Sequence, residues 1–117
     1  MNYMILIYND PTKVPPYGSA EFNEMMAGYG ILNKTMQADG VIRSGDGLED
    51  VAKATSVRVR GGKVETMDGP FAETKEQLGG YYLLKARDLN EAIQLASRIP
   101  GARFGSIEVR PVMEFDS

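Results

Sequence analysis

The chain is organised around the stretch MDGPFAETKEQLGGYYLL, which runs from Met67 to Leu84. Its beginning predicts a turn at Asp68–Pro70, because Asp can hydrogen-bond the backbone that follows it, Gly tolerates a positive φ angle, and a residue before Pro avoids the helical conformation. From Tyr81 onward the stretch is rich in strand-forming residues. One strand must therefore stop near Met67, and another must run through Tyr81.

The middle of this stretch predicts one helical turn over residues 75–78. Thr74 with Gln77 three residues later matches a capping box, and Gly79 can take the left-handed conformation that ends many helices. So short a helix needs support from the rest of the fold. Together with Glu73, the charged residues of this turn form the densest polar constellation in the sequence, which makes this stretch the first candidate for a functional site.

Composition predicts a single globular domain over residues 1–117, with 43% hydrophobic and 25% charged residues. The absence of Cys excludes disulfides, thiol nucleophiles and zinc–thiolate sites. A net charge of -3 argues against nucleic acid as a partner, because binding to phosphates needs clustered cations. The carboxylates Asp46, Glu49 and Asp50 lack the spacing of a metal loop, so neither a metal nor a cofactor is predicted.

The N-terminus lacks the basic flank and cleavage site of a signal peptide. No apolar run approaches the ~18 residues that a membrane-spanning helix needs. We therefore expect a cytoplasmic protein with no membrane partner.

The first half of the chain predicts a strand followed by a helix. Tyr3–Tyr8 is a short apolar run of strand formers, and the Pro-rich segment Asn9–Ser19 predicts a loop. Ser19 is a suitable N-cap for a helix that ends at Gly40. The predicted buried stripe of this helix comprises Phe22, Met25, Met26, Tyr29, Leu32 and Met36.

Short strands follow this helix. Val41–Arg43 predicts one of them, and Gly45–Gly47 predicts a turn. Thr55–Arg60 and Lys63–Met67 alternate apolar and polar residues on either side of Gly61 and Gly62, a pattern typical of a hairpin with a two-residue turn.

The last third of the chain predicts strand, helix and strand. Gly80–Ala86 is predicted as a strand. Asp88 and Glu91 match a capping box that begins the second helix, and Pro100 ends that helix. Ser106–Val112 alternates as a final strand. The resulting order, with right-handed crossovers, predicts a ferredoxin-like α+β sandwich, a mainly antiparallel sheet with two helices on one face.

Two helices cannot cover both faces of this sheet, although two of its strands are apolar on both sides. Along the first strand, every second side chain must face away from the helices. These side chains are either Met4, Leu6 and Tyr8 or Tyr3, Ile5 and Ile7. One of the pairs Tyr81 with Leu83 or Tyr82 with Leu84 must join it. Five such side chains at roughly 1.5–3 kcal/mol each amount to about 7–15 kcal/mol, so we expect a homodimer that hides this face.

The quoted motifs carry a resemblance to a known family. DGPF (residues 68–71), AETKE (72–76) and GGYY (79–82) resemble the DGPF-containing branch of the YCII-related domain family. The Tyr3–Tyr8 strand, the hairpin and the Ile99–Gly101 segment fit the same pattern. The resemblance implies a dimeric α+β barrel with a cleft between sheet and helices. It also implies that most relatives have no assigned reaction, and that some are linked to extracytoplasmic-function sigma factors.

One departure from the family is important. A better understood branch acts through a His–Asp pair in lyase-like or dehydrochlorinase-like chemistry, and this sequence has no His. Proton transfer near neutral pH would then need a carboxylate whose pKa is raised by burial, or a Lys whose pKa is lowered by it. The predicted site comprises the carboxylates Asp68 and Glu73, the anion-holding groups Lys75 and Arg43, and the cleft walls Tyr8 and Tyr81.

Structural roles for the same residues are the alternative. Asp68 would then cap the turn, Glu73 and Lys75 would form a surface pair worth about 0–1 kcal/mol, and Tyr81 would belong to the dimer core. Three functional hypotheses follow in order: a protein that binds an unknown small molecule in a cleft near the Asp68–Phe71 loop, an enzyme that uses carboxylates for proton transfer or elimination, and a partner of a sigma factor. Whether the protein is an enzyme stays open at this stage.

Overall fold

The computed structural model describes residues 1–70 and 74–115. These residues form six strands, two α-helices and two 3₁₀ helices. In chain order the elements are β1 (Asn2–Asn9), α1 (Ala20–Ala38), β2 (Ile42–Gly47), η1 (Val51–Lys53), β3 (Thr55–Arg60), β4 (Lys63–Asp68), β5 (Gln77–Lys85), α2 (Leu89–Ser97), η2 (Pro100–Arg103) and β6 (Gly105–Pro111).

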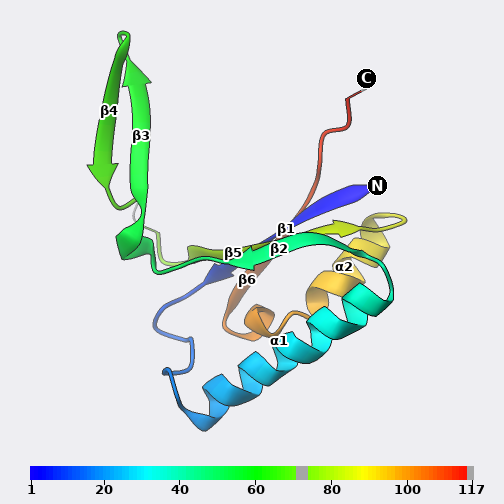
Figure 1. Cartoon of the computed structure of the whole chain (residues 1–117). Helices are drawn as coiled ribbons and strands as arrows, with labels where there is room; N and C mark the ends of the chain where they lie inside the picture. Colours follow the sequence, from blue (N-terminus) through cyan, green and yellow to red (C-terminus); the bar gives the residue numbers. More distant parts are fainter. Residues whose placement is uncertain (71–73, 116–117) are drawn as a thin grey trace.

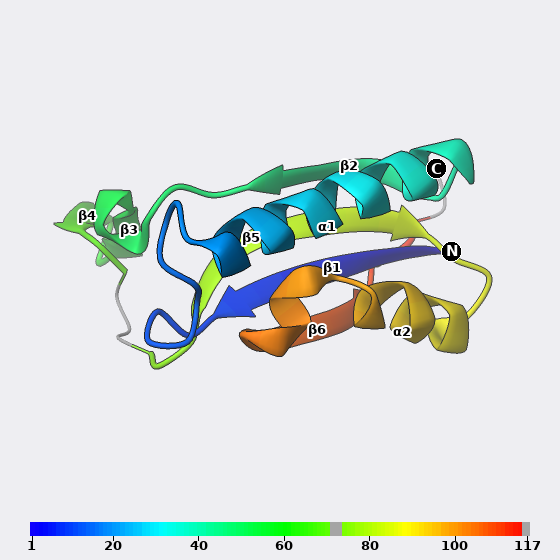
Figure 2. The same ribbon diagram turned by 90° about the horizontal axis from the view of Figure 1, so that it is seen from below.

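The main sheet has the order β2-β5-β1-β6, with antiparallel neighbours throughout the described residues. Both α-helices lie on the same face of this sheet (Figures 1 and 2), where α1 contacts β2 and α2 contacts β6. This arrangement confirms the predicted ferredoxin-like α+β sandwich. No described helix is long and apolar enough to cross a bilayer.

The core lies between the helices and one alternate set of β1 side chains. Tyr3, Ile5 and Ile7 are 3%, 0% and 6% exposed and pack with Leu84 of β5. The side chains of Met4, Leu6 and Tyr8 therefore point to the other face, because successive side chains of a strand alternate. The register of β5 on β1 places Tyr81 and Leu83 with them. We call this second surface the open face.

Helix α1 begins and ends as predicted. The Ser19 Oγ accepts a hydrogen bond from the Phe22 backbone N–H at 3.1 Å, and Gly40 has a φ of +70°. Of the predicted stripe, however, only Leu32 and Met36 are buried, and Met26 is 51% exposed. The first half of the helix borders a pocket, so its apolar side chains are not all covered.

The predicted helical turn over residues 75–78 is wrong. β5 already begins at Gln77, which pairs with Asn9, and the Gly79 carbonyl accepts a hydrogen bond from the Leu48 backbone N–H at 2.8 Å. The Thr74 hydroxyl donates to the Glu76 carbonyl instead of capping a helix. Strand pairing on both sides satisfies more backbone groups than a single marginal turn does.

The predicted turn at Gly45–Gly47 is also wrong, because these residues extend β2 along β5. A Cβ atom on Gly45 would lie 2.6 Å from the Tyr82 ring. This glycine therefore makes room for an aromatic side chain. The sequence did not distinguish that use of glycine from a turn.

Strands β3 and β4 form the predicted hairpin, which we call the arm. Gly61 and Gly62 have φ values of +57° and +78°, as a two-residue turn with positive φ at both central positions requires. The arm is a separate two-stranded sheet. It rises from the body on the side opposite the helices (Figure 1).

Candidate functional site

One pocket lies on each face of the main sheet at the end near the arm. Alternation along β1 puts Tyr8 on the open face and Ile7 beneath α1. A shift in the register between β1 and β5 then pairs Leu78 with Tyr8 in the first pocket and Gly80 with Ile7 in the second. We call the first the arm-base pocket and the second the helix-side pocket.

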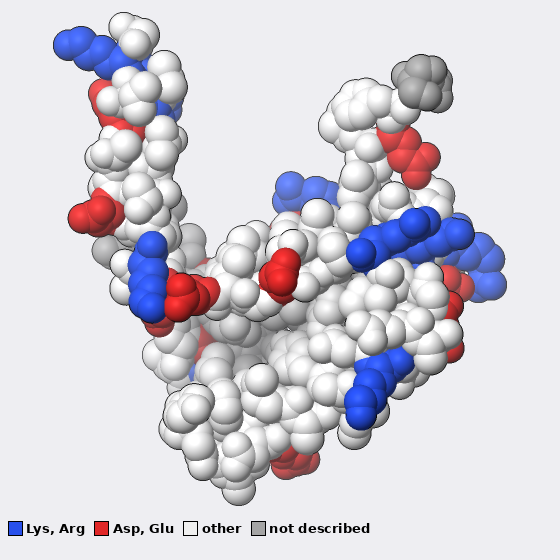
Figure 3. Space-filling view, viewed as in Figure 1, with Lys and Arg blue, Asp and Glu red and all other residues white. Residues whose placement is uncertain are grey.

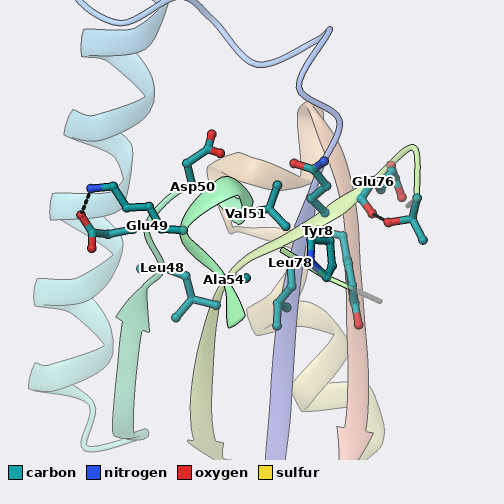
Figure 4. A pocket seen from close by; sticks show the side chains of 13 residues that line it. Tyr8, Leu48, Glu49, Asp50, Val51, Ala54, Glu76 and Leu78 are labelled. Carbon is teal, nitrogen blue, oxygen red and sulfur yellow. Dashed lines mark hydrogen bonds and ion pairs between the residues drawn. The ribbon is translucent and has the colours of Figure 1, made fainter. Parts of the chain in front are cut away.

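The arm-base pocket is the larger, with a volume of about 840 Å³. It is built from three segments that are distant in sequence: β1, the connection from β2 through η1 to β3, and the start of β5 with the residues that precede it. Figure 4 shows apolar side chains together with a polar rim. The apolar part comprises Tyr8, Leu48, Val51, Ala54, Pro70 and Leu78.

The rim of the arm-base pocket carries more acidic than basic groups. The Lys53 Nζ lies 2.9 Å from the Glu49 carboxylate, and Asp50 caps η1 by accepting a hydrogen bond from the Ala52 backbone N–H at 2.8 Å. Glu76 also lines the pocket, and among the described residues its carboxylate has no ion-pair partner. The rim therefore favours a ligand that is neutral or positively charged.

Next to this pocket, Lys75 faces a shallower hollow that it shares with Tyr8 and Asp10. Asp10 is buried, and its carboxylate accepts hydrogen bonds from the Thr12 hydroxyl at 2.6 Å and the Thr12 backbone N–H at 2.9 Å. These bonds hold the pKa of Asp10 below its ordinary value, and the charges of Lys75 and Lys13 add to the effect. Asp10 therefore stays ionised and holds the loop after β1 in place.

The helix-side pocket has a volume of about 320 Å³. Its lining combines apolar side chains with Asp46 and with the polar groups of Tyr29, Asn33 and Tyr82. The Tyr82 hydroxyl donates to the Asn33 side-chain oxygen at 2.6 Å, and the Tyr29 hydroxyl accepts from the Gly101 backbone N–H at 3.2 Å. Burial raises the pKa of both tyrosines, so both are neutral near pH 7.

The structure brings together part of the site predicted from sequence. Tyr8 and Lys75 lie close to the arm-base pocket, and Pro70 of the predicted loop lines it. Asp68 is the last residue of β4, where it is exposed and pairs with Thr55. Glu73 lies outside the described residues. The hypothesis of carboxylate-dependent proton transfer by Asp68 and Glu73 therefore stays a prediction.

The other two predicted residues lie elsewhere on β2 and β5. Arg43 is exposed beside the β2 bulge opposite Leu83 and Leu84, roughly 15–20 Å along β5 from Leu78 at about 3.3 Å per residue. The Tyr81 hydroxyl donates to the Asp46 carboxylate at 2.9 Å, and this negative partner raises the pKa of Tyr81. Neither residue lines the arm-base pocket, and Tyr81 is instead one of the residues around the helix-side pocket.

Sequence reasoning missed the segment from Leu48 to Ala54 as part of the pocket. Asp50 followed by the Ala52 N–H is a local capping signal that could have marked η1. Glu49 and Lys53 are spaced as a helical i,i+4 pair, which points to the same turn. In the helix-side pocket, by contrast, no local signal identifies Asn33 as the partner of Tyr82, because the two residues meet only through the fold.

This is a ferredoxin-like α+β protein with a pocket on each side of its sheet. The sequence model of the YCII-related domain family matches residues 1–116, and the chain belongs to that family. It is similar to an uncharacterized protein of Rhizobium meliloti (strain 1021), with 34% identity over 114 residues, which cover 96% of this chain and 92% of the relative. The family match adds no observation on a sigma-factor partner, which stays a prediction.

A solved structure has the same fold. It is the 5-chloro-2-hydroxyhydroquinone dehydrochlorinase TftG from Burkholderia phenoliruptrix AC1100, in complex with 2,5-dihydroxybenzoquinone. The similarity has a TM-score of 0.52 and covers 98% of this chain and 96% of that chain, with 12% sequence identity. At this identity the similarity describes the fold, not the chemistry.

Proposed function

We propose that this protein binds a small molecule in the arm-base pocket. The observation that carries the proposal is the pocket itself, with apolar side chains below a rim of charged and hydroxyl groups and a volume of about 840 Å³. Small-molecule sites usually span ~300–1,000 Å³ and combine apolar walls with a few polar groups. A plain connection between strands does not need such a convergence of three segments.

The lining residues indicate the class of ligand. Tyr8 offers an aromatic ring at the base of the pocket, which suits a flat or cyclic apolar group. Lys53 is already engaged by Glu49, whereas Glu76 has no cationic partner among the described residues. The ligand is therefore a compact cyclic compound that is neutral or positively charged. Because a dehydrochlorinase of the same fold is in complex with a dihydroxybenzoquinone, cyclic carbonyl compounds belong in any library of probes.

Thermal unfolding in the presence of such a library tests the proposal. Cyclic amines, aromatic alcohols and cyclic carbonyl compounds are added singly, and a binding compound raises the unfolding temperature because it stabilises only the folded state. A response that is flat across the library would contradict the proposal.

A matched pair of variants locates the site of any compound that binds. Leu48 lines the arm-base pocket and is 49% exposed, whereas Met26 lines the helix-side pocket and is 51% exposed. We expect Leu48→Lys to abolish the shift and Met26→Lys to preserve it. The opposite pattern would move the site to the helix-side pocket.

A further inference from the structure

A further groove lies among the helices, on the helix-covered side of the sheet. It runs between the N-terminal part of α1 and the segment that leads from the end of α2 through η2 (Figure 2). Its volume of about 620 Å³ is within the range of ~300–1,000 Å³ that is usual for small-molecule sites. We call it the helix groove.

Close packing holds the two walls of the helix groove in place. A Cβ atom on Gly28 of α1 would lie 3.0 Å from the Pro100 Cγ, so the glycine allows α1 and η2 to approach each other. The Gly101 backbone N–H donates a hydrogen bond to the Tyr29 hydroxyl at 3.2 Å, which joins the same two elements. The groove is therefore built into the folded chain and does not need a ligand to form.

The wall formed by α1 combines carboxylates with apolar side chains. Glu21, Glu24 and Ile31 are three and seven residues apart, so they share one face of the helix. Ile31 is 68% exposed, whereas the buried residues of α1 are Leu32 and Met36. Figure 3 shows that uncharged side chains make up most of the surface over α1, with acidic groups at its lower edge. The exposed apolar face of this wall is therefore available to a ligand.

The opposite wall carries cations. Arg98 is the C-cap residue of α2, Arg103 is the last residue of η2, and both side chains are exposed. The Arg103 guanidinium lies 5.9 Å from the centroid of the Phe104 ring, which also lines the groove. Within the described part of the chain, neither the carboxylates of one wall nor the guanidinium groups of the other have an ion-pair partner. The groove therefore presents unpaired negative charge on one side and unpaired positive charge on the other.

We infer that the helix groove binds a short apolar peptide with free ends. The carboxylates of Glu21 and Glu24 hold the ammonium group of the peptide, and the guanidinium groups of Arg98 and Arg103 hold its carboxylate. Its apolar side chains pack beside Ile31.

The separation of the two walls indicates the size of the ligand. The carboxylates and the guanidinium groups do not meet at ion-pair distance, so a ligand that contacts both must separate its own charges. An amino acid carries both charges on one carbon atom, whereas an extended peptide of two or three residues separates them by roughly 7–11 Å. The inference does not rest on the arm-base pocket, which opens on the other face of the sheet.

NMR titration of the isotope-labelled full chain with leucyl-leucine and leucyl-glycyl-leucine tests the inference. We expect shifts of the backbone amides of α1 and η2, with a dissociation constant on the order of 0.1–1 mM because so small a ligand makes few contacts. Acetylation of the N-terminus of the peptide, or amidation of its C-terminus, should each weaken binding by roughly two- to fivefold, the effect of one exposed charge pair.

Charge-neutral variants assign each end of the peptide to one wall. In Glu21→Gln/Glu24→Gln, acetylation of the peptide should no longer change the affinity, whereas amidation still should. In Arg98→Gln/Arg103→Gln, amidation should lose its effect and acetylation should keep it. Glu65→Gln on the arm changes the same net charge far from the groove and should bind as the wild type does. Circular dichroism confirms that each variant is folded.

The same titrations also contain the results that would overturn the inference. These are the absence of any shift at millimolar peptide, equal affinity for free and blocked peptides, and binding of leucine alone as tight as that of the peptides. Leu48→Lys, in the arm-base pocket, should leave peptide binding unchanged. A loss of peptide binding in this variant would place the peptide in the arm-base pocket and would overturn the helix groove as its site.

Discussion

The two faces of the main sheet carry the same kinds of apolar residue, but these residues are buried on one face and partly exposed on the other. On the helix-covered face, Ile5 is fully buried and belongs to a continuous core. On the open face, its neighbour Leu6 is equally apolar and stays partly exposed beside an open pocket. The difference shows that an apolar position on a strand identifies a surface that must be buried. It does not identify the element that buries it. The helices cover one face, and we infer that a second copy covers the other.

Adjacent residues of β1 give the sharpest test of this comparison. Ile5→Ala should lower the free energy of unfolding by about 2–5 kcal/mol, because it leaves a cavity in a packed core. Leu6→Ala should lower it by less than half as much at protein concentrations where the chain is monomeric. Urea unfolding followed by circular dichroism measures both. Equal losses at low concentration would mean that the open face is packed within one chain.

Two glycines of β2 distinguish the packed part of the helix-covered face from its hollow part. A Cβ on Gly45 would collide with the Tyr82 ring, whereas a Cβ on Gly47 meets nothing within 4 Å. Gly45→Ala should therefore cost about 1–3 kcal/mol, and Gly47→Ala should change stability by about 0.5 kcal/mol or less. Thermal unfolding of the two variants measures both changes in stability. A large loss at Gly47 would show that the helix-side pocket is filled.

Neighbouring tyrosines of β5 extend the comparison to polar contacts. Tyr82→Phe leaves the half-buried Asn33 without its partner and should cost about 1 kcal/mol. Tyr81→Phe removes an exposed contact with Asp46 and should cost less than Tyr82→Phe does. Denaturant unfolding of both variants measures the two costs. A larger loss of stability in Tyr81→Phe than in Tyr82→Phe would contradict the prediction.

The pH dependence of stability gives the smallest effect. Burial raises the pKa of Tyr82 above its ordinary value of 10.0. The folded state favours the neutral phenol, so its stabilising contribution is complete below pH 10 and is lost as the pH rises through the raised pKa. Above pH 10 the wild type should therefore lose stability more steeply than Tyr82→Phe. Alkaline unfolding curves would refute this if their slopes were the same.

The fold could be predicted from sequence because its main signals are local. Ser19 and Asp88 cap their helices as expected, and Gly61 and Gly62 form the expected turn. Errors arose where tertiary contacts decided the outcome. Gly45 accommodates the Tyr82 ring, and Gln77 joins a strand because β1 lies beside it.

The pocket could be predicted only in part. Of the predicted Asp68–Pro70 turn, Pro70 lines the pocket. The opposite wall, from Leu48 to Ala54, lies about 20 residues earlier in the chain and carries no apolar periodicity. Only its charge marks Arg43 as a candidate for the site, and charge does not fix position along a strand. Spatial convergence of this kind follows from the sheet register, which the sequence did not specify.

Hydrogen exchange at the backbone amides of the arm tests the central claim most directly. An arm that packs on a second copy has slow exchange at β3 and β4, and its protection rises with protein concentration while that of α1 stays constant. We predict this coupled rise, and we predict that the variant V57T/V59T/V64T, which removes the apolar side of the arm, loses it. Rapid arm exchange at every concentration, as in a free hairpin, would contradict the account.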